Sequence, residues 1–152
     1  MENSLSYNRK LKNFPVGQKF DHWPGKTITE SDNNLFCLLT MNHHPVHLDS
    51  EYAQNRQHGK RLVVGTYVLS LVVGMTVSDI SGAAIANLGY NKVIHHNPVF
   101  INDTLYAKSE VLDIQIKEDR PDRGIVKVRT EAFNQNKEIV LSFERSVLIP
   151  EK

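Results

Sequence analysis

The chain has one cysteine, Cys37, among its 152 residues, so it cannot form an intrachain disulfide. A single thiolate also cannot anchor a structural zinc site. No apolar run approaches the roughly 20 residues that a membrane-spanning helix needs, and the first residues show no apolar segment of the secretory type. These absences predict a cytosolic protein in which Cys37 is a buried structural residue.

An excess of charge of either sign is absent too. The 18 Lys and Arg side chains nearly balance the 17 Asp and Glu, for a formal net charge of +1. No net field therefore draws the chain to nucleic acid or to an anionic membrane. The length and the apolar fraction of 40% are typical of one folded domain. We expect residues 1–13, which are polar, to form a partly ordered arm, and residues 14–152 to form the domain.

Helical patterns occupy the first half of the chain. Thr29 is placed to cap a helix, with Asp32 three residues on as a capping partner, and the apolar face of this helix is expected at Leu35, Phe36, Leu38 and Leu39. Pro45 interrupts the helix, and Asp49 or Ser50 begins a short one. A longer helix is expected after Gly65, over 66–89. Its first part is apolar nearly all round, which is typical of a helix buried in the middle of a domain.

The hydrophobic period changes to two in the second half of the chain. The pattern predicts strands near 91–96, 104–115, 124–134 and 138–149, joined by polar turns at 119–124 and 134–137. A short strand near 14–22, followed by a tight turn at Pro24 and Gly25, completes a set of five. The fold class expected is α+β, an antiparallel sheet wrapped around a long central helix.

Three histidines, His43, His44 and His47, fall within five residues. His44 and His47 have the spacing of a metal-ligand pair, but Pro45 breaks the helical geometry and no third ligand follows at a recognisable spacing. His47, flanked by Val46 and Leu48, is better suited to general acid/base catalysis on a rigid turn, because histidine titrates near neutral pH. A structural histidine with its hydrogen bonds satisfied is the alternative.

Gly65 begins the apolar helix and is the second candidate. The first amides of a helix have no partner inside it, and the helix dipole favours negative charge there. A glycine allows a ligand oxygen to approach the backbone closely, as an oxyanion site requires. A glycine needed only for packing is the alternative.

These elements together resemble the MaoC-like hotdog family, which includes R-specific enoyl-CoA hydratases. The resemblance covers residues 14–149. It rests on TITESDNNLF, on the kinked PVHLD segment with Ala53 beyond it, on Gly65 eighteen residues after His47, and on NPVFINDTLYAKSEV. The blocks HWPGKTITESDNNLF, LTMNHHPVHLD, ANLGYNKV and GIVKVRTEAFNQ are similar to the mesaconyl-CoA hydratase or β-methylmalyl-CoA dehydratase branch.

The resemblance implies a single hotdog fold and a hydro-lyase that adds or removes water across the α,β double bond of an acyl-CoA thioester. His47 is then the acid/base residue, and the Gly65 amide polarises the thioester carbonyl. Asn42 stands where the family usually has an aspartate. Because an amide cannot exchange a proton as a carboxylate does, we expect Asn42 to position the water.

The narrower resemblance implies a branched C4–C5 dicarboxylic substrate such as mesaconyl-CoA. A cation is then needed for the free carboxylate, and the candidates are Arg56, Lys60 and Arg61, with help from His43 or His44; a solvated charged loop is the alternative. The family resemblance implies no cofactor or metal and at least a homodimer, which would also cover an open sheet edge.

Two other functions share these features. A hotdog acyl-CoA thioesterase would need a carboxylate facing the thioester carbon, for which Asp49 or Asp79 would have to serve. A non-catalytic acyl-CoA-binding module would explain Asn42, but such a module has no need of a base like His47.

Overall fold

The computed structural model describes residues 6–116 and 118–152. Five strands form one antiparallel sheet in the order β1-β3-β4-β5-β2. Their bounds are β1 Lys19–Thr27, β2 Ala86–His95, β3 Thr104–Ile116, β4 Arg123–Phe133 and β5 Ile139–Pro150. The predicted α+β class, with five strands around a central helix, is confirmed, and residues 1–5, part of the expected N-terminal arm, lie outside the described residues.

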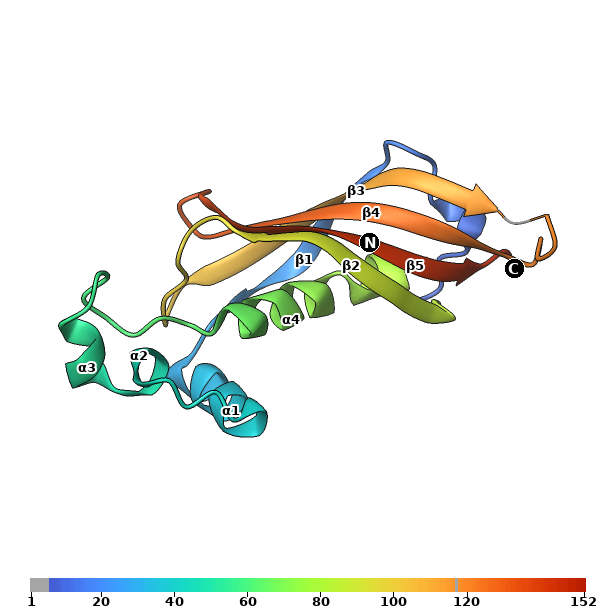
Figure 1. Ribbon diagram of the computed structural model, residues 1–152. Coiled ribbons are helices and arrows are strands. Elements are labelled where there is room, and N and C mark those ends of the chain that lie inside the picture. Colours follow the sequence, from blue (N-terminus) through green and yellow to red (C-terminus); the bar gives the residue numbers. More distant parts are fainter. Residues whose placement is uncertain (1–5, 117) are drawn as a thin grey trace.

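The helices divide into two groups (Figure 1). The helix α4, Gly65–Met75, runs along one face of the sheet, whereas α1 (Glu30–Thr40), α2 (Pro45–Leu48) and α3 (Ser50–Gln54) gather beyond one end of it. A 3₁₀ turn, Leu11–Asn13, and a π turn, Val77–Ser81, complete the helical segments. In the described part of the chain, no helix is long and apolar enough to cross a membrane.

Two apolar clusters fill the space beneath the sheet. In the first, Val68 and Val72 of α4 pack against side chains of β3, β4 and β5, including Leu105 and Phe143. The second gathers around Phe14, Ile80, Val126 and other buried side chains, and includes Leu11 of the 3₁₀ turn. Burial of α4 agrees with its apolar sequence, but Leu69, Leu71, Val73 and Met75 are only partly buried within this chain. One side of α4 is therefore left open.

The predicted end of the long helix is wrong. The helix α4 stops at Met75, and β2 begins at Ala86 where we expected helix as far as residue 89. The register runs from Ala86 opposite Leu148 to His95 opposite Leu141, so pairing with β5 decides the conformation of this segment. Because β5 would otherwise lack a neighbour on that side, sheet hydrogen bonding outweighs local helical preference.

The first strand also differs from its prediction. It spans Lys19–Thr27 rather than 14–22, and Pro24 and Gly25 lie inside it. The pairing of β1 with β3 shifts register between His22 and Lys26, so the expected turn is an irregularity within the strand. A Cβ on Gly25 would lie 2.6 Å from the Tyr106 ring, which explains a glycine there.

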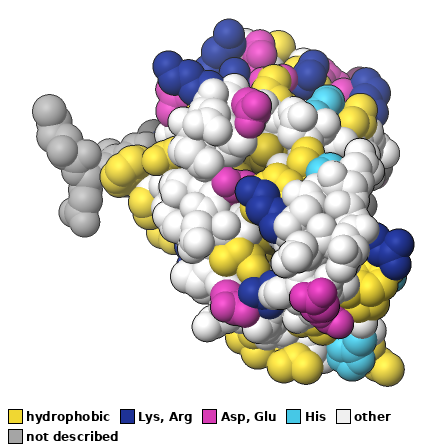
Figure 2. Space-filling model, turned by 90° about the vertical axis from the view of Figure 1, so that its left-hand side faces the viewer, with side chains coloured by type: hydrophobic (Ala, Val, Ile, Leu, Met, Phe, Trp, Pro, Cys, Tyr) yellow, Lys and Arg dark blue, Asp and Glu magenta, His cyan; other side chains and the backbone are white. Residues whose placement is uncertain are grey.

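The start of α1 is confirmed and its buried face is not. Thr29 Oγ1 accepts a hydrogen bond from the Asp32 amide at 3.2 Å, and Asp32 Oδ2 accepts one from the Thr29 amide at 2.8 Å. Leu35, Leu38 and Leu39 are exposed, whereas Asn33 and Cys37 are fully buried. The helix packs mainly against α2. Its buried side is therefore the one that carries Asn33 and Cys37. Figure 2 shows hydrophobic side chains lying exposed among charged ones on this end of the molecule.

Candidate active site

The helix α2 holds His47 in one orientation. Pro45 is the first residue of this helix, and Leu62 joins it through two backbone contacts. The Leu62 amide donates to the Val46 carbonyl at 3.1 Å, and His47 Nδ1 lies 2.9 Å from the Leu62 carbonyl oxygen. Since a carbonyl only accepts, Nδ1 of His47 carries the proton and Nε2 keeps its lone pair. His47 is therefore set up as a base at Nε2.

The N-terminus of α4 lies beside His47. Val64 caps the helix without a side-chain hydrogen bond, and the Gly65 amide, as the first of the helix, has no intrahelical acceptor. A cavity of about 370 Å³ is lined by both His47 and Gly65. The structure thus brings together the two residues that the sequence placed eighteen positions apart. A proton acceptor and a free helix amide border one space that is large enough for a reacting group.

Asn33 links these two groups, and the sequence reading missed it. Its side chain is fully buried in α1. Its Nδ2 donates to the His47 carbonyl at 3.1 Å, and its Oδ1 accepts from the Val64 amide at 3.0 Å. One amide side chain therefore fixes α2 relative to the start of α4. The sequence could have indicated its burial, because Asn33 lies one helical turn before Cys37, which is predicted to be buried, on the same face of the helix.

Three further histidines, His58, His95 and His96, line the same cavity. Nε2 of His96 bonds with Ser142 Oγ at 2.8 Å, and the His58 ring packs edge-on against Phe100. His95 and His96 are adjacent in the predicted strand 91–96 and so point to opposite faces, which by itself indicates only surface or interface positions. Nothing in the sequence singles out His58. No motif spacing connects these three residues with His47.

The other candidates on the segment before α2, which are Asn42, His43 and His44, do not line this cavity. Met41 ends α1 with a left-handed backbone, and Asn42 follows it, half-buried. The Asn42 side chain is not among those that line the cavity. His43 is exposed, and Nδ1 of His44 accepts from the Val46 amide at 3.1 Å, so His44 caps α2. Among the residues described, no group of three metal-ligating side chains is arranged to hold a metal ion.

The basic loop before α4 has local partners. The Arg56 guanidinium lies over the Tyr52 ring at 4.2 Å from its centroid, and Lys60 lies over Phe100 at 3.9 Å. Arg61 pairs with Glu30 of α1. Each cation thus has a contact within the chain, and Arg56 keeps the edge of its guanidinium free for an anion, since it stacks through its face.

A buried polar cluster around one histidine, His22, lies between the two apolar clusters. His22 donates through Nδ1 to Asp79 at 2.9 Å, and its Nε2 lies 2.7 Å from Ser109 Oγ, which bonds in turn with Thr130 Oγ1 at 2.8 Å. Burial lowers the pKa of His22 and outweighs the opposing effect of Asp79. The neutral ring then accepts from Ser109, so both nitrogens of His22 are occupied. These three residues are arranged in the order Ser, His, Asp, and His22 and Ser109 are both buried.

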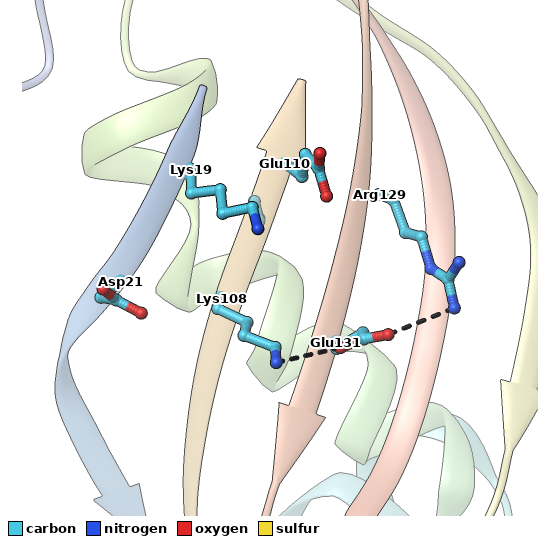
Figure 3. Close-up of a pocket in the computed structure, with 7 residues that line it drawn as sticks. Lys19, Asp21, Lys108, Glu110, Arg129 and Glu131 are labelled. Carbon is cyan, nitrogen blue, oxygen red and sulfur yellow. Dashed lines mark ion pairs between the residues drawn. The ribbon is translucent and has the colours of Figure 1, made fainter. Parts of the chain in front are cut away.

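The outer face of the sheet carries a charged hollow of about 330 Å³ (Figure 3). Its charges alternate across the strands. Lys19 pairs in register with Glu110 and Glu110 with Arg129, while in the next row Asp21, Lys108 and Glu131 follow one another. Glu131 forms ion pairs with Lys108 at 3.3 Å and with Arg129 at 3.2 Å. Cross-strand charge pairing of this kind stabilises a sheet, so the hollow needs no ligand to explain it.

The fold and the cavity can be compared with known proteins. A conserved protein of Mycobacterium tuberculosis, described as having a double hotdog fold, superposes on 96% of this chain with a TM-score of 0.87 and 23% identity, over 45% of its own length. This match shows the hotdog fold. Residues 12–134 match the model of the MaoC like domain, and the chain belongs to that family. The family predicted from the sequence is confirmed.

Curated relatives share the sequence more closely. A mesaconyl-CoA hydratase of Haloarcula marismortui is 31% identical over 91% of this chain, and a β-methylmalyl-CoA dehydratase of Chloroflexus aurantiacus is 30% identical over 91%. The chain spans only 39% and 44% of their lengths. An (R)-specific enoyl-CoA hydratase of Aeromonas caviae is 28% identical over 89% of this chain and 95% of that protein.

Proposed function

We propose that this chain is a hydratase or dehydratase that adds or removes water across the α,β double bond of an acyl-CoA thioester. The observation that carries the proposal is the cavity shared by His47, with Nε2 free, and the amide of Gly65. The (R)-specific enoyl-CoA hydratase of matching length and the two hydratase relatives of greater length support it.

The chemistry follows from these two groups. The thioester oxygen accepts a hydrogen bond from the Gly65 amide, which makes the β-carbon electrophilic. His47 Nε2 takes a proton from water as the water oxygen bonds to the β-carbon. The electron pair of the double bond moves toward the α-carbon and the thioester oxygen. His47 then returns its proton to the α-carbon, and dehydration is the reverse of these steps.

Asn42 has the role of orienting the attacking water in this proposal. It lies on the α1–α2 connection, five residues before His47, and no hydrogen bond joins its side chain to another described residue. Its amide can therefore donate to and accept from water. Because the side chain lies outside the cavity lining, His47 carries the proton transfer and Asn42 contributes less. Asn42→Ala with an unchanged kcat would remove Asn42 from the mechanism.

A branched dicarboxylic substrate such as mesaconyl-CoA is the finer part of the proposal. Its support is the similarity to the mesaconyl-CoA hydratase and the β-methylmalyl-CoA dehydratase. Arg56, with its guanidinium edge free, is the cation best placed among the loop residues to meet the second carboxylate, because Arg61 already pairs with Glu30.

A homodimer completes the proposal. Strands β1 and β2 are the edges of the sheet, and α4 has half-buried apolar side chains on its open side. The mesaconyl-CoA hydratase of Haloarcula marismortui is about twice as long as this chain, and the protein of Mycobacterium tuberculosis, of which this chain covers 45%, has a double hotdog fold. A second copy of this chain would supply the second hotdog. A sedimentation mass of one chain at micromolar concentration would contradict this assembly.

Both carboxylates that a thioesterase could use have other partners in the structure. Asp49 Oδ1 accepts from the Tyr52 amide at 2.9 Å and caps α3. Asp79 bonds with His22 in the core. Neither residue lines the cavity of His47, and among residues 6–116 and 118–152 no carboxylate borders it to activate water against the thioester carbon.

The test follows the absorbance of the conjugated enoyl thioester with crotonyl-CoA and mesaconyl-CoA. We expect the wild-type chain to consume the absorbance without releasing thiol, and His47→Ala to lower the rate by about 10³-fold while remaining folded. Activity on crotonyl-CoA alone would remove the dicarboxylate. Thiol release would favour the thioesterase, and binding of both thioesters without turnover would favour the binding module.

A further inference from the structure

His95, the last residue of β2, lies against Gly65. Its ring atoms Cε1 and Nε2 are 3.1 and 3.2 Å from the position that a Cβ on Gly65 would take. Those distances are shorter than ordinary van der Waals contact, so any residue larger than glycine would push the ring away. The missing side chain of Gly65 therefore makes room for an imidazole at the first turn of α4.

The ring atoms nearest to the Gly65 Cβ position are Cε1 and Nε2, and Nδ1 is 3.6 Å away. His95, Gly65 and His47 all line the same cavity. When Nε2 of His95 is protonated, two donors border this cavity, the ring N–H and the backbone N–H of Gly65. Paired donors of this kind stabilise an oxygen that gains negative charge.

His95 is free to donate, unlike its neighbour. Nε2 of His96 bonds with Ser142 Oγ at 2.8 Å. His95 is exposed in this chain, and its ring has no hydrogen-bond partner among residues 6–116 and 118–152. A ring that stood there only for packing would be equally well served by phenylalanine. An unused Nε2 beside the helix start points to a ligand oxygen.

We propose that His95 supplies, through Nε2–H, a second hydrogen bond to the thioester oxygen that the Gly65 amide binds. The assignment rests on the proposed hydration of an acyl-CoA. As the water oxygen bonds to the β-carbon, the double-bond electrons move toward the thioester oxygen, where both donors meet the charge. His47 takes the proton from water and returns it to the α-carbon. His95 keeps its own proton throughout, so no other reactant is needed.

The test measures the carbonyl directly. Butyryl-CoA with ¹³C at the carbonyl, bound to the full chain, reports hydrogen bonding by a lower infrared stretching frequency and cannot react. We expect His95→Phe, which keeps a flat ring of similar size, to lose part of that shift. His95→Gln, which retains an N–H donor, should keep more of it. Asn91→Phe, at an exposed position of the same strand outside the cavity lining, is the control and should leave the frequency as in the wild type.

Turnover gives the second measurement. His95→Phe should lower kcat for crotonyl-CoA on the order of 10²-fold, the effect expected for removing one oxyanion donor, with a smaller change in KM and with partial rescue by His95→Gln. Wild-type frequency and kcat in His95→Phe would overturn the proposal and leave the ring a packing role. If the wild type hydrates no enoyl-CoA but its carbonyl shift still depends on His95, the proposed hydration fails and the His95 contact stands.

Discussion

His22 and His47 each donate through Nδ1 to an oxygen at 2.9 Å, and they differ in their burial and in whether the second nitrogen has a partner. Both nitrogens of His22 are occupied, by Asp79 at 2.9 Å and by Ser109 at 2.7 Å, and its side chain is buried. His47 has one nitrogen on the Leu62 carbonyl at 2.9 Å, and its ring borders the cavity. An imidazole with both nitrogens satisfied holds the fold together, whereas one with a free nitrogen at a cavity can move a proton.

The Ser–His–Asp order around His22 illustrates the difference. Its distances match those of a nucleophilic triad, but Ser109 and His22 are both buried, and Ser109 donates to the His22 ring. Geometry among the three side chains is therefore insufficient evidence for catalysis. Access to the cavity, which His47 has and His22 lacks, decides the assignment.

The largest effect expected from this comparison is on stability. His22→Ala should lower the free energy of unfolding by about 3 kcal/mol, because it opens a cavity and leaves Asp79 and Ser109 each short of a buried partner. His47→Ala, at a half-buried ring with one bond, should cost about 1 kcal/mol or less. Urea unfolding of both variants measures the two values. Equal losses would show that the two histidines do not differ as described.

Asn33 gives the next effect, on rate rather than on folding. Asn33→Leu removes the hydrogen bonds to the His47 carbonyl and from the Val64 amide. The position of the His47 ring relative to the Gly65 amide is then no longer fixed by a shared side chain. We expect kcat for crotonyl-CoA to fall by about 30-fold, since small misplacements of catalytic groups are costly, with KM less affected.

Asn33→Asp separates this positioning role from general destabilisation. A carboxylate keeps the acceptor for the Val64 amide and loses the donor to the His47 carbonyl. It should therefore lie between the wild type and Asn33→Leu in kcat. If kcat follows only the fraction of folded protein in both variants, the positioning role is wrong.

The smallest effect is a pH dependence of stability. Burial holds the pKa of folded His22 below its unfolded value, near 6.5. The unfolded chain therefore binds more protons than the folded chain as pH falls below about 6.5, and the contribution of His22 to stability, complete above that pH, is lost toward acid. The slope is at most about 1.4 kcal/mol per pH unit.

Unfolding free energies of the wild type and of His22→Gln between pH 7.5 and 5.5 isolate this dependence. The lowered pKa values of Asp32 and Glu144 act in more acidic solution, because carboxylates titrate near pH 4. The wild type should lose stability more steeply than the variant. Parallel curves would mean that His22 does not titrate with folding.

The sequence by itself determined where the helices begin and pointed to the two residues that we propose as central to the site. Thr29, Asp32 and Asp49 cap helices by accepting hydrogen bonds from backbone amides three residues away. Pro45 begins α2 because its ring fixes φ near the helical value. The family pattern identified His47 and Gly65, since both belong to motifs of fixed spacing. Interactions between residues close in the chain can be predicted from the sequence alone.

Only the tertiary structure decided what depends on distant contacts. The segment from Ala86 is a strand because β5 offers it hydrogen bonds, and α1 buries Asn33 instead of its leucines because α2 and α4 need an amide between them. His95 reaches Gly65 by the same sheet pairing, thirty positions along the chain. Residues far apart in sequence meet only when β2 joins the sheet, and no local pattern encodes that contact.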